Sequence, residues 1–580
     1  MDAVASPPRR GPDFRELYTP KLITVLREGY GLSGFRADAV AGLTVAIVAL
    51  PLSMAIAIAS HVTPERGLFT AIVGSLIVSL LGGTRFQVGG PAGAFIVLVA
   101  STVDRHGLDG LFLATMMAGV MLAVAGFLRL GTYVKFIPYP VTVGFTAGIA
   151  LIIFSSQIHD LLGLTLTGKE PAELLPKLVA LAGAAGTVNP AAVLVTALTI
   201  GIIIALKKLR PTWPAFLIAV AAASLAVAAL SLPVETIGTR FGGIPRSLPA
   251  PSLPPVSIDR MLVMLPDAIS FALLGAIESL LSAVVADGMT GRRHRSNCEL
   301  VAQGVANMAS PIFGGICVTG LIARTATNIR AGARSPVSGI MHAVFVLLFM
   351  AVAAPLASYI PLAALAGVLA TVAWNMVEKP AVAALVRSSR GDALVLLVTF
   401  ALVVLRDLTT GIVVGFALGA LIFINRMSRA VSVEAHAPPV EEDRPDTANG
   451  ARVPYDASEA SDPDTVVYHI SGAFFFGAAA TVGTVLDRIA DQRRNFVLDC
   501  SKVPFLDSTA ANVIEGAVRK ASRAHVRFYI AGASPAVRRM LLSHGVRQPH
   551  ARYGASVKSV LEHIRGQAAK GSHGHPIREH

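Results

Sequence analysis

The chain has 580 residues, of which 53% are hydrophobic and only 15% are charged, and its formal net charge is +13. Soluble globular proteins carry about 25% charged residues, so a mean hydropathy of +0.64 indicates a protein that crosses a membrane several times. The lysines and arginines lie mostly in short loops between apolar segments, which is typical of membrane proteins and argues against a nucleic-acid-binding surface.

Apolar segments recur along residues 38–429, which we predict to form a membrane transport domain. A membrane-spanning helix needs about 20 apolar residues. Two further apolar pieces, 91–102 and 321–329, are too short to cross a bilayer as straight helices and follow glycine-containing stretches. Counting both gives fourteen segments, seven on either side of a loop near 235–260. The longer segments are expected at 38–59, 66–82, 110–129, 137–156, 190–206, 213–232, 262–286, 300–313, 336–355, 359–377, 391–405 and 409–425.

The positive charges in the loops predict the orientation of the chain. An even number of crossings places both termini on one side of the membrane. The loops on that side hold about twice as many lysine and arginine residues as the loops on the other side, and such an excess marks the cytoplasmic face. We therefore expect a multi-pass protein of the cell (inner) membrane. Residues 1–37 lack the pattern of a signal peptide and are expected to form a cytoplasmic N-terminal segment.

The composition changes after residue 429. Residues 430–464 are rich in proline, glutamate and aspartate, which predicts a linker. In residues 465–566, short strand patterns alternate with helical ones, as in a small cytoplasmic α/β domain. Residues 567–580 are expected to be disordered. The predicted strands are Thr465–Ser471, 496–500 and 526–530, and the predicted helices are 510–521, 536–543 and 556–565.

Two interrupted spans occupy matching places in the two groups of seven segments. The third segment begins FQVGGPAGA at residue 86, and the tenth begins GGICVTGLIART at residue 314. Each pattern predicts an extended stretch followed by a half-helix. Backbone that is not helical is tolerated at membrane depth where it lines an enclosed cavity, and paired interruptions point to a transporter's binding site. The alternative is two kinked spans with a structural role.

Half-helices that start at the centre of the membrane favour an anion. Their free N–H groups and the positive ends of their dipoles would both face the ligand. Arg324 lies in the first turns of the second half-helix. Placing an arginine inside a membrane costs free energy, so such a residue indicates a functional site. It could attract the anion, or it could belong to a structural ion pair. The candidate anion-binding residues are Gln87, Gly90, Ala92, Gly320, Leu321, Ile322 and Arg324.

Glu278 is a carboxylate in the middle of the long apolar segment 262–286. Burial disfavours the ionised form of a carboxyl group, so this side chain could bind the proton that is coupled to anion transport. Together with Ser282 and backbone oxygens it could instead hold sodium. A salt bridge or hydrogen bond that locks two helices together is the structural alternative.

These motifs, in this order and spacing, resemble those of the SulP anion transporters, known in animals as solute carrier family 26. The resemblance covers nearly all of residues 30–565. It implies a 7+7 inverted repeat with a core and a gate domain, an elevator-like motion of the core and a homodimer. The anion would bind between the third and tenth half-helices. The residues that carry the resemblance are 87–94, 275–282, 286–288, 297–307 (NCELVAQGVAN) and 319–334 (TGLIARTATNIRAGAR).

The resemblance also bears on the coupling ion and on the C-terminal domain. Glu278 matches an acidic position of the family, where sodium-coupled bicarbonate transporters carry aspartate, with threonine in place of Ser282; the glutamate therefore favours a proton. Residues 465–566 resemble a STAS domain, on VLDCS at 497–501 and FLDSTA at 505–510. Ser508 fits a helix N-cap. In related domains a serine at this place is phosphorylated, and a phosphate on a helix N-terminus is chemically reasonable.

The sequence thus predicts a secondary transporter and not an enzyme. It shows no ATP-binding loop, no metal cluster and no nucleophile elbow, so we expect an ion gradient to drive transport, with no cofactor. Sulfate with proton symport is the first hypothesis. A bicarbonate or C4-dicarboxylate transporter, coupled to sodium or protons, and an anion exchanger or channel on the same fold remain alternatives. A nucleobase carrier is disfavoured by the STAS domain and by Arg324.

Overall fold

The computed structural model describes residues 17–132, 138–166, 168, 170–171, 173–210, 213–429, 432–436, 464–475 and 494–571. Contacts between Cα atoms divide the chain into two compact units, residues 1–419 and 420–580. The first unit is helical, and the second contains a five-stranded sheet with its helices.

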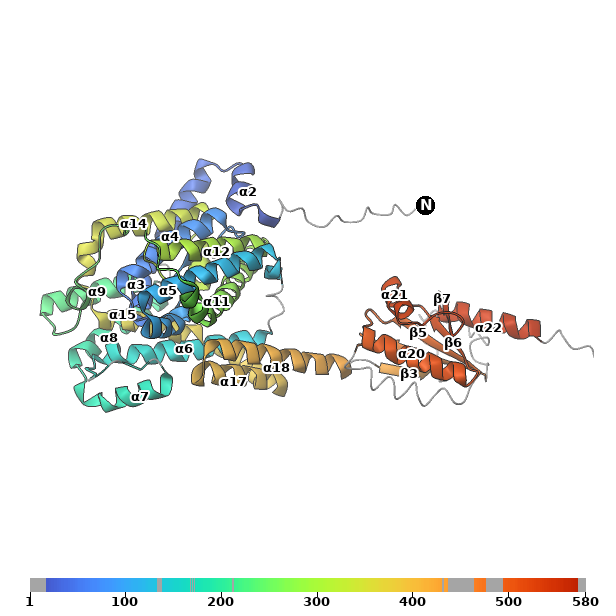
Figure 1. Cartoon of the computed structure of the whole chain (residues 1–580). Coiled ribbons are helices and arrows are strands. Elements are labelled where there is room, and N and C mark those ends of the chain that lie inside the picture. Colours follow the sequence, from blue (N-terminus) through green and yellow to red (C-terminus); the bar gives the residue numbers. More distant parts are fainter. Residues whose placement is uncertain are drawn as a thin grey trace, which may run out of the picture. The chain divides into compact units, whose positions relative to one another are not determined.

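Long apolar helices make up the first unit (Figure 1). Within the described residues, nine helices are long and apolar enough to cross a membrane. Every apolar segment predicted from the sequence overlaps a helix, although α9, α12, α13 and α17 are shorter than those nine. The count of fourteen crossings stays a prediction. The helices are α2 (Lys21–Arg27), α3 (Leu32–Ala59), α4 (Pro64–Leu81), α5 (Ile96–Phe127), α6 (Tyr139–Leu162), α7 (Leu174–Gly183), α8 (Pro190–Leu209), α9 (Ala215–Leu230), α10 (Ile237–Phe241), α11 (Ile258–Thr290), α12 (Ser296–Ile312), α13 (Ile322–Arg330), α14 (Val337–Ala357), α15 (Leu362–Met376), α16 (Lys379–Ser388), α17 (Arg390–Leu405) and α18 (Leu408–Arg429).

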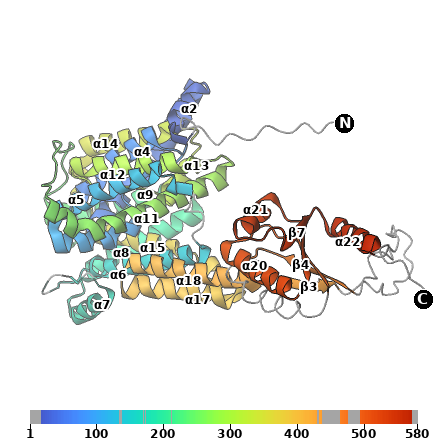
Figure 2. The ribbon, with the colours of Figure 1, turned by 45° about the vertical axis from the view of Figure 1, so that its right-hand side comes forward.

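The spanning helices pack as two bundles. Helices α3, α4, α5, α11, α12, α13 and α14 contact one another and form the first bundle, whereas α6, α8, α9, α15 and α17 form the second. Helix α18 lies along α17 (Figure 2), where Gly411 and Gly415 approach Val403 and Thr399. Helix α3 also contacts α9 and α15 and thereby joins the bundles. The family resemblance implies a core and a gate domain; which bundle plays which role stays a prediction.

Helices α5 and α12 lie with their backbones in contact. A Cβ added at Gly119 would lie 2.7 Å from the carbonyl oxygen of Gly304, and a Cβ added at Gly304 would lie 2.6 Å from that of Gly119. Small residues that allow such close approach are the usual basis of helix packing in membranes, where lipid is as apolar as the side chains. Helix α12 is therefore closely fitted to α5.

Helix α5 is interrupted at Gly107, where φ is 68° and ψ is −173°. Glycine adopts a positive φ without steric cost, so the helix can break and resume there. The break separates a short helix from a longer one, in agreement with the separate predicted segments 91–102 and 110–129.

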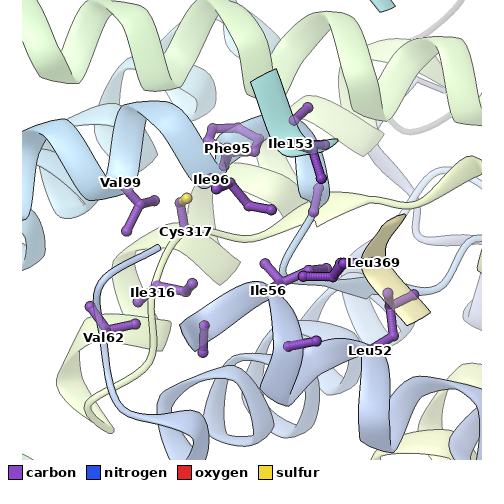
Figure 3. Close-up of a cluster of buried hydrophobic side chains, with 14 of the residues drawn as sticks. Leu52, Ile56, Val62, Phe95, Ile96, Val99, Ile153, Ile316, Cys317 and Leu369 are labelled. Atoms are coloured by element: carbon purple, nitrogen blue, oxygen red, sulfur yellow. The ribbon is translucent and has the colours of Figure 1, made fainter. Parts of the chain in front are cut away.

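Apolar side chains from both bundles meet around the start of α5 (Figure 3). Phe95 and Ile96 lie there together with Ile56 of α3, Ile153 of α6 and Leu369 of α15, and all five are buried. Since lipid can also solvate these groups, their contribution comes mainly from close packing. The first half-helix therefore begins where the two bundles touch.

The second unit contains a sheet with strand order β3-β4-β5-β6-β7. Strand β3 is antiparallel to β4, and the remaining pairs are parallel. Apolar side chains lie on both faces of β5, as expected of a parallel strand covered on both sides: Phe496 and Leu498 pack with α20 and α21, and Val497 packs with α22. The elements are β3 (Ser432–His436), β4 (Thr465–Ser471), β5 (Asn495–Lys502), α20 (Ser508–Arg523), β6 (Arg527–Ala531), α21 (Pro535–Ser543), β7 (Ala551–Gly554) and α22 (Val557–Gly571).

All the predicted elements of this domain are present, but the structure adds to them. Strand β3 lies at the start of the predicted linker 430–464, and the short strand β7 was not predicted because four residues carry too little pattern. Helix α22 continues to Gly571, into the tail predicted to be disordered. Residues 437–463 and 572–580 lie outside the described residues.

Candidate anion-binding site

The two glycine-containing stretches meet as a pair of two-residue strands. Strand β1 (Gly89–Gly90) is antiparallel to β2 (Thr319–Gly320), with Gly89 opposite Gly320. The Leu321 N–H donates to the carbonyl of Val88 over 3.1 Å. The first strand is followed by the 3-10 turn Gly93–Phe95 and α5, and the second by α13. The extended stretches and the helices after them are as predicted, and both helices start beside the same strand pair.

Glycine leaves room for a neighbouring side chain at two positions of this crossing. A Cβ at Gly320 would lie 1.4 Å from Nε2 of Gln87, and a Cβ at Gly90 would lie 2.7 Å from Nη1 of Arg324. Both are closer than carbon and nitrogen can approach. The glycines therefore make room for two of the predicted site residues.

Helix α11 holds both strands through hydrogen bonds. Ser279 accepts from Gln87 Nε2 at its carbonyl (3.2 Å) and from the Gly320 N–H at its hydroxyl oxygen (3.3 Å). Ser282, one turn further on, donates to the Thr325 hydroxyl over 3.3 Å, and this oxygen also accepts from the Val88 N–H. Gln87 and Ser282 are buried. The structure thus brings Gln87, Gly320 and Ser282 into one network.

Arg324 is a buried cation, and most of its donors are unused within the part of the chain that the structure describes. Only 2% of the residue is exposed, and Nη2 donates to Ser53 of α3 over 2.8 Å. Its Nε and Nη1 have no hydrogen-bond partner among the described residues. The structural ion pair considered from the sequence is not found in that part of the chain. Burying a positive charge without an opposite charge beside it costs free energy. A bound anion would reduce that cost.

Glu278 lies next to Ser279 on α11 and is partly exposed. No hydrogen bond or ion pair joins it to another described residue, so the helix-locking alternative is not observed there. A carboxyl group in this setting is available to a proton or a cation. Its role in coupling stays a prediction.

The other candidate residues differ in exposure. Ala92 is buried and precedes the 3-10 turn, and Leu321 is the half-buried N-cap of α13. Ile322 is 37% exposed. The structure therefore places the polar candidates at the crossing and Ile322 at a more open position.

A large cavity of the first unit lies elsewhere. It has a volume of about 550 Å³ and is lined mostly by apolar side chains of α3, α9 and α14, among them Met54, Val220 and Met350. None of the predicted site residues lines it. An anion needs hydrogen-bond donors, and the mostly apolar lining of this cavity offers few of them; the strand crossing stays the candidate anion site.

Sequence reasoning missed Ser53, Ser279 and Thr325, the hydroxyl groups that hold Arg324 and the strands. Single hydroxyls in apolar helices give little signal because they can bond to their own helix backbone. Ser279 does this as well, donating to the Gly275 carbonyl over 2.6 Å.

In the C-terminal domain, the assignment of Ser508 as a helix N-cap is wrong. Asp507 is the N-cap of α20, and its side chain accepts from the Ala510 N–H over 2.9 Å. Ser508 is the first residue of the helix and is exposed. An aspartate caps as well as a serine does, so sequence alone could not choose between neighbours. Phosphorylation of Ser508 remains a prediction.

Comparisons with known proteins agree with this architecture. A sequence profile of the Sulfate permease family matches residues 35–399, and one of the STAS domain matches residues 458–548. The putative sulfate transporter YvdB of Bacillus subtilis is 40% identical over 522 residues, which is 90% of this chain and 95% of that protein. The bicarbonate transporter BicA of Picosynechococcus is 30% identical over 524 residues, or 87% and 90% of the two chains.

Solved structures show the same fold. The structure of SLC26A9 aligns with a TM-score of 0.80 at 16% identity and covers 95% of this chain and 93% of that one. The transmembrane domain of a cyanobacterial BicA aligns with a TM-score of 0.59 at 32% identity, over 67% and 98%. The chain is therefore a member of the sulfate permease (SulP/SLC26) family of multi-pass membrane anion transporters and carries a C-terminal STAS domain.

Proposed function

We propose that this protein is a secondary active transporter of sulfate that couples uptake to protons. The observation that carries the proposal is the crossing of β1 and β2, where two helix starts lie beside a buried arginine that has donors without a partner among the described residues. A helix N-terminus offers N–H groups and a partial positive charge to an anion, and two of them facing one point act together.

The anion binds between the start of α5 and the start of α13. Arg324 contributes a positive charge at the crossing, because its Nη1 lies close to Gly90 of β1. Gln87 and Ser279 fix the strands, and Ala92, Leu321 and Ile322 shape the space around the ligand. Sulfate is favoured by the similarity to a putative sulfate transporter over most of both chains.

Glu278 supplies the coupling. When it is protonated the site is more positive and binds a dianion better, and when it is ionised it repels the anion. The anion and the proton therefore bind together, and a proton gradient can drive sulfate uptake. Sodium held by Glu278 and Ser282 is the alternative coupling ion.

The two bundles supply the motion. The first bundle carries both strands and both helix starts, so it can move as one body against the second bundle in an elevator-like step. We place both termini and the STAS domain in the cytoplasm and the membrane unit in the cell (inner) membrane as a homodimer. Ser508, exposed on α20, is available for a regulatory phosphate.

Bicarbonate is the second candidate substrate. It is favoured by the similarity to BicA both in sequence, at 30% identity, and in the fold of the transmembrane domain, with a TM-score of 0.59. Backbone N–H groups would bind sulfate, bicarbonate and a C4-dicarboxylate for the same electrostatic reason.

Competition in proteoliposomes tests the substrate. Uptake of labelled sulfate would be measured against a tenfold excess of unlabelled sulfate, bicarbonate, malate or chloride. Inhibition by sulfate well above that by the other anions supports the proposal. Uptake of labelled bicarbonate without uptake of sulfate would contradict it, and strict dependence on an anion inside the vesicles would indicate an exchanger.

A further inference from the structure

Three polar side chains form a line on one face of α12. Glu299, Gln303 and Asn307 are spaced four residues apart, and residues at this spacing lie one above the other on a helix. All three are buried, with at most 3% of any of them exposed. Buried polar groups inside a membrane bundle are rare and need partners. We call these residues the α12 ladder.

Glu299 holds the backbone segment that leads into β1. Its Oε2 accepts from the N–H groups of Gly83 (2.9 Å) and Thr84 (3.2 Å) and from the Thr84 hydroxyl (3.2 Å). This stretch leads directly to Gln87 and β1. The position of the first strand along α12 is therefore fixed by one carboxylate.

Asn307 holds the residue that leads into β2. Its Oδ1 accepts from the Val318 N–H over 2.8 Å, and its Nδ2 donates to the Val318 carbonyl over 2.8 Å. Val318 immediately precedes β2. One amide thus satisfies both backbone groups of the residue that enters the second strand.

Gln303 connects the two ends. Its side-chain Nε2 donates to Glu299 Oε1 over 3.0 Å, and its backbone carbonyl accepts from Asn307 Nδ2 over 2.8 Å. Its side-chain Oε1 has no partner among the described residues. The eight residue steps from Glu299 to Asn307 rise about 12 Å along the helix axis, so a rigid element links the two points of attachment.

We propose that the α12 ladder is the positioning device of the anion site: it sets the spacing of β1 and β2 and makes them move as one body. The ladder residues do not touch the anion; they act through the strands that carry Gln87 and Gly320. Because α12 is closely fitted to α5 at Gly119 and Gly304, the ladder also ties both strands to the first bundle. The inference rests on the proposed function for its effect on transport, but its structural part can be tested separately.

The test of the structural part is hydrogen exchange of the full-length protein in detergent or nanodiscs. Asn307→Ala leaves the Val318 N–H and carbonyl without partners, so amide exchange should rise at least tenfold in residues 316–321. If the ladder couples the strands, exchange also rises in residues 86–90, on the opposing strand. Faster exchange confined to residues 316–321 would overturn the coupling. No change in either 316–321 or 86–90 would overturn the proposal. This readout does not require the anion to be known.

The test in transport compares Glu299→Ala with Glu299→Gln. A glutamine can still accept from Gly83 and Thr84, and its new N–H₂ can donate to Gln303 if that amide turns its free Oε1 around. Glu299→Gln should therefore keep the apparent KM for labelled sulfate. Glu299→Ala and Asn307→Ala should raise it roughly tenfold, equivalent to about 1.4 kcal/mol, with the maximal rate per folded protein within about twofold. Val305→Ala, on another face of α12, is the matched control and should match the wild type.

Each contrary result has a distinct meaning. A wild-type KM in both alanine variants would overturn the positioning role. Loss of proton-driven accumulation in Glu299→Gln at an unchanged KM would make Glu299 a proton carrier and overturn the proposal in favour of that role. If an alanine variant does not fold, Asn307→Asp, which keeps the bond to the Val318 N–H but cannot donate to the carbonyl, should give an intermediate KM. No sulfate uptake by the wild type would contradict the substrate only, because the hydrogen-exchange result stands alone.

Discussion

The guanidinium of Arg324 lies against the backbone of Gly90, so closely that a Cβ at Gly90 would stand 2.7 Å from Nη1. Gly90→Ala should therefore displace either Arg324 or β1 and raise the apparent KM for the anion, by about tenfold if one charged contact is lost. Uptake kinetics in proteoliposomes would measure it. Gly288→Ala, where a Cβ meets nothing within 4 Å, is the control; an unchanged KM in both variants would show that the fit of Arg324 to Gly90 is not needed.

The charge of Arg324 can be separated from its shape. Arg324→Gln removes the charge and should reduce anion affinity by at least tenfold, whereas Arg324→Lys keeps the charge but loses the bond to Ser53 or its geometry. We expect the order wild type, Lys, Gln in affinity measured by anion-dependent thermal stabilisation of the purified protein. Equal affinity of all three would remove Arg324 from the anion site.

Glu278 can be tested without altering the crossing. Glu278→Gln should leave anion binding largely intact, because the side chain bonds to no other described residue, but should abolish accumulation driven by a pH gradient. Uptake with and without the gradient would separate the two effects. Unchanged accumulation in the variant would exclude Glu278 from the coupling role.

Much of this site follows from the sequence, and the reasons for the rest are physical. The glycines of β1 and β2 and the lone Arg324 are conspicuous in apolar segments, so the two extended stretches and the half-helices after them could be predicted, but the pairing of β1 with β2 could not. The α12 ladder could not: the motif that contains Glu299 and Asn307 was visible, but no pattern tells which distant backbone groups a buried polar side chain will satisfy. For the same reason Ser53 and Ser279 were missed. In the C-terminal domain the fold followed from alternation, whereas β3 lies in a segment whose composition predicted a linker and the four residues of β7 carry too little pattern.

The start of α20 depends on Asp507 and not on Ser508. Asp507→Ala removes the bond to the Ala510 N–H and should destabilise the domain by about 1 kcal/mol, whereas Ser508→Ala should change stability little. Hydrogen exchange in residues 508–514 of the full-length protein would measure the difference. A larger effect of Ser508→Ala would restore the serine as the cap.

Cys500 should be inert in the folded protein. Burial on β5, with 1% of the residue exposed, raises the pKa of its thiol to about 12. Since the thiolate is the reactive form, the raised pKa keeps the group protonated at pH 7–9. Alkylation by iodoacetamide, followed by mass spectrometry, should be slow over this whole range and fast after denaturation. Rapid labelling at pH 8 in the native state would contradict the burial of this strand.

The central claim, that anion and proton bind together at the crossing of β1 and β2, is tested most directly by uptake of labelled sulfate into proteoliposomes with an inward proton gradient and no sodium. We expect accumulation above equilibrium that collapses when a protonophore is added and is absent in Glu278→Gln. Sulfate uptake that never exceeds equilibrium, or that is unaffected by the protonophore, would contradict proton coupling. No sulfate uptake at all would contradict the substrate assignment and make bicarbonate the first candidate substrate.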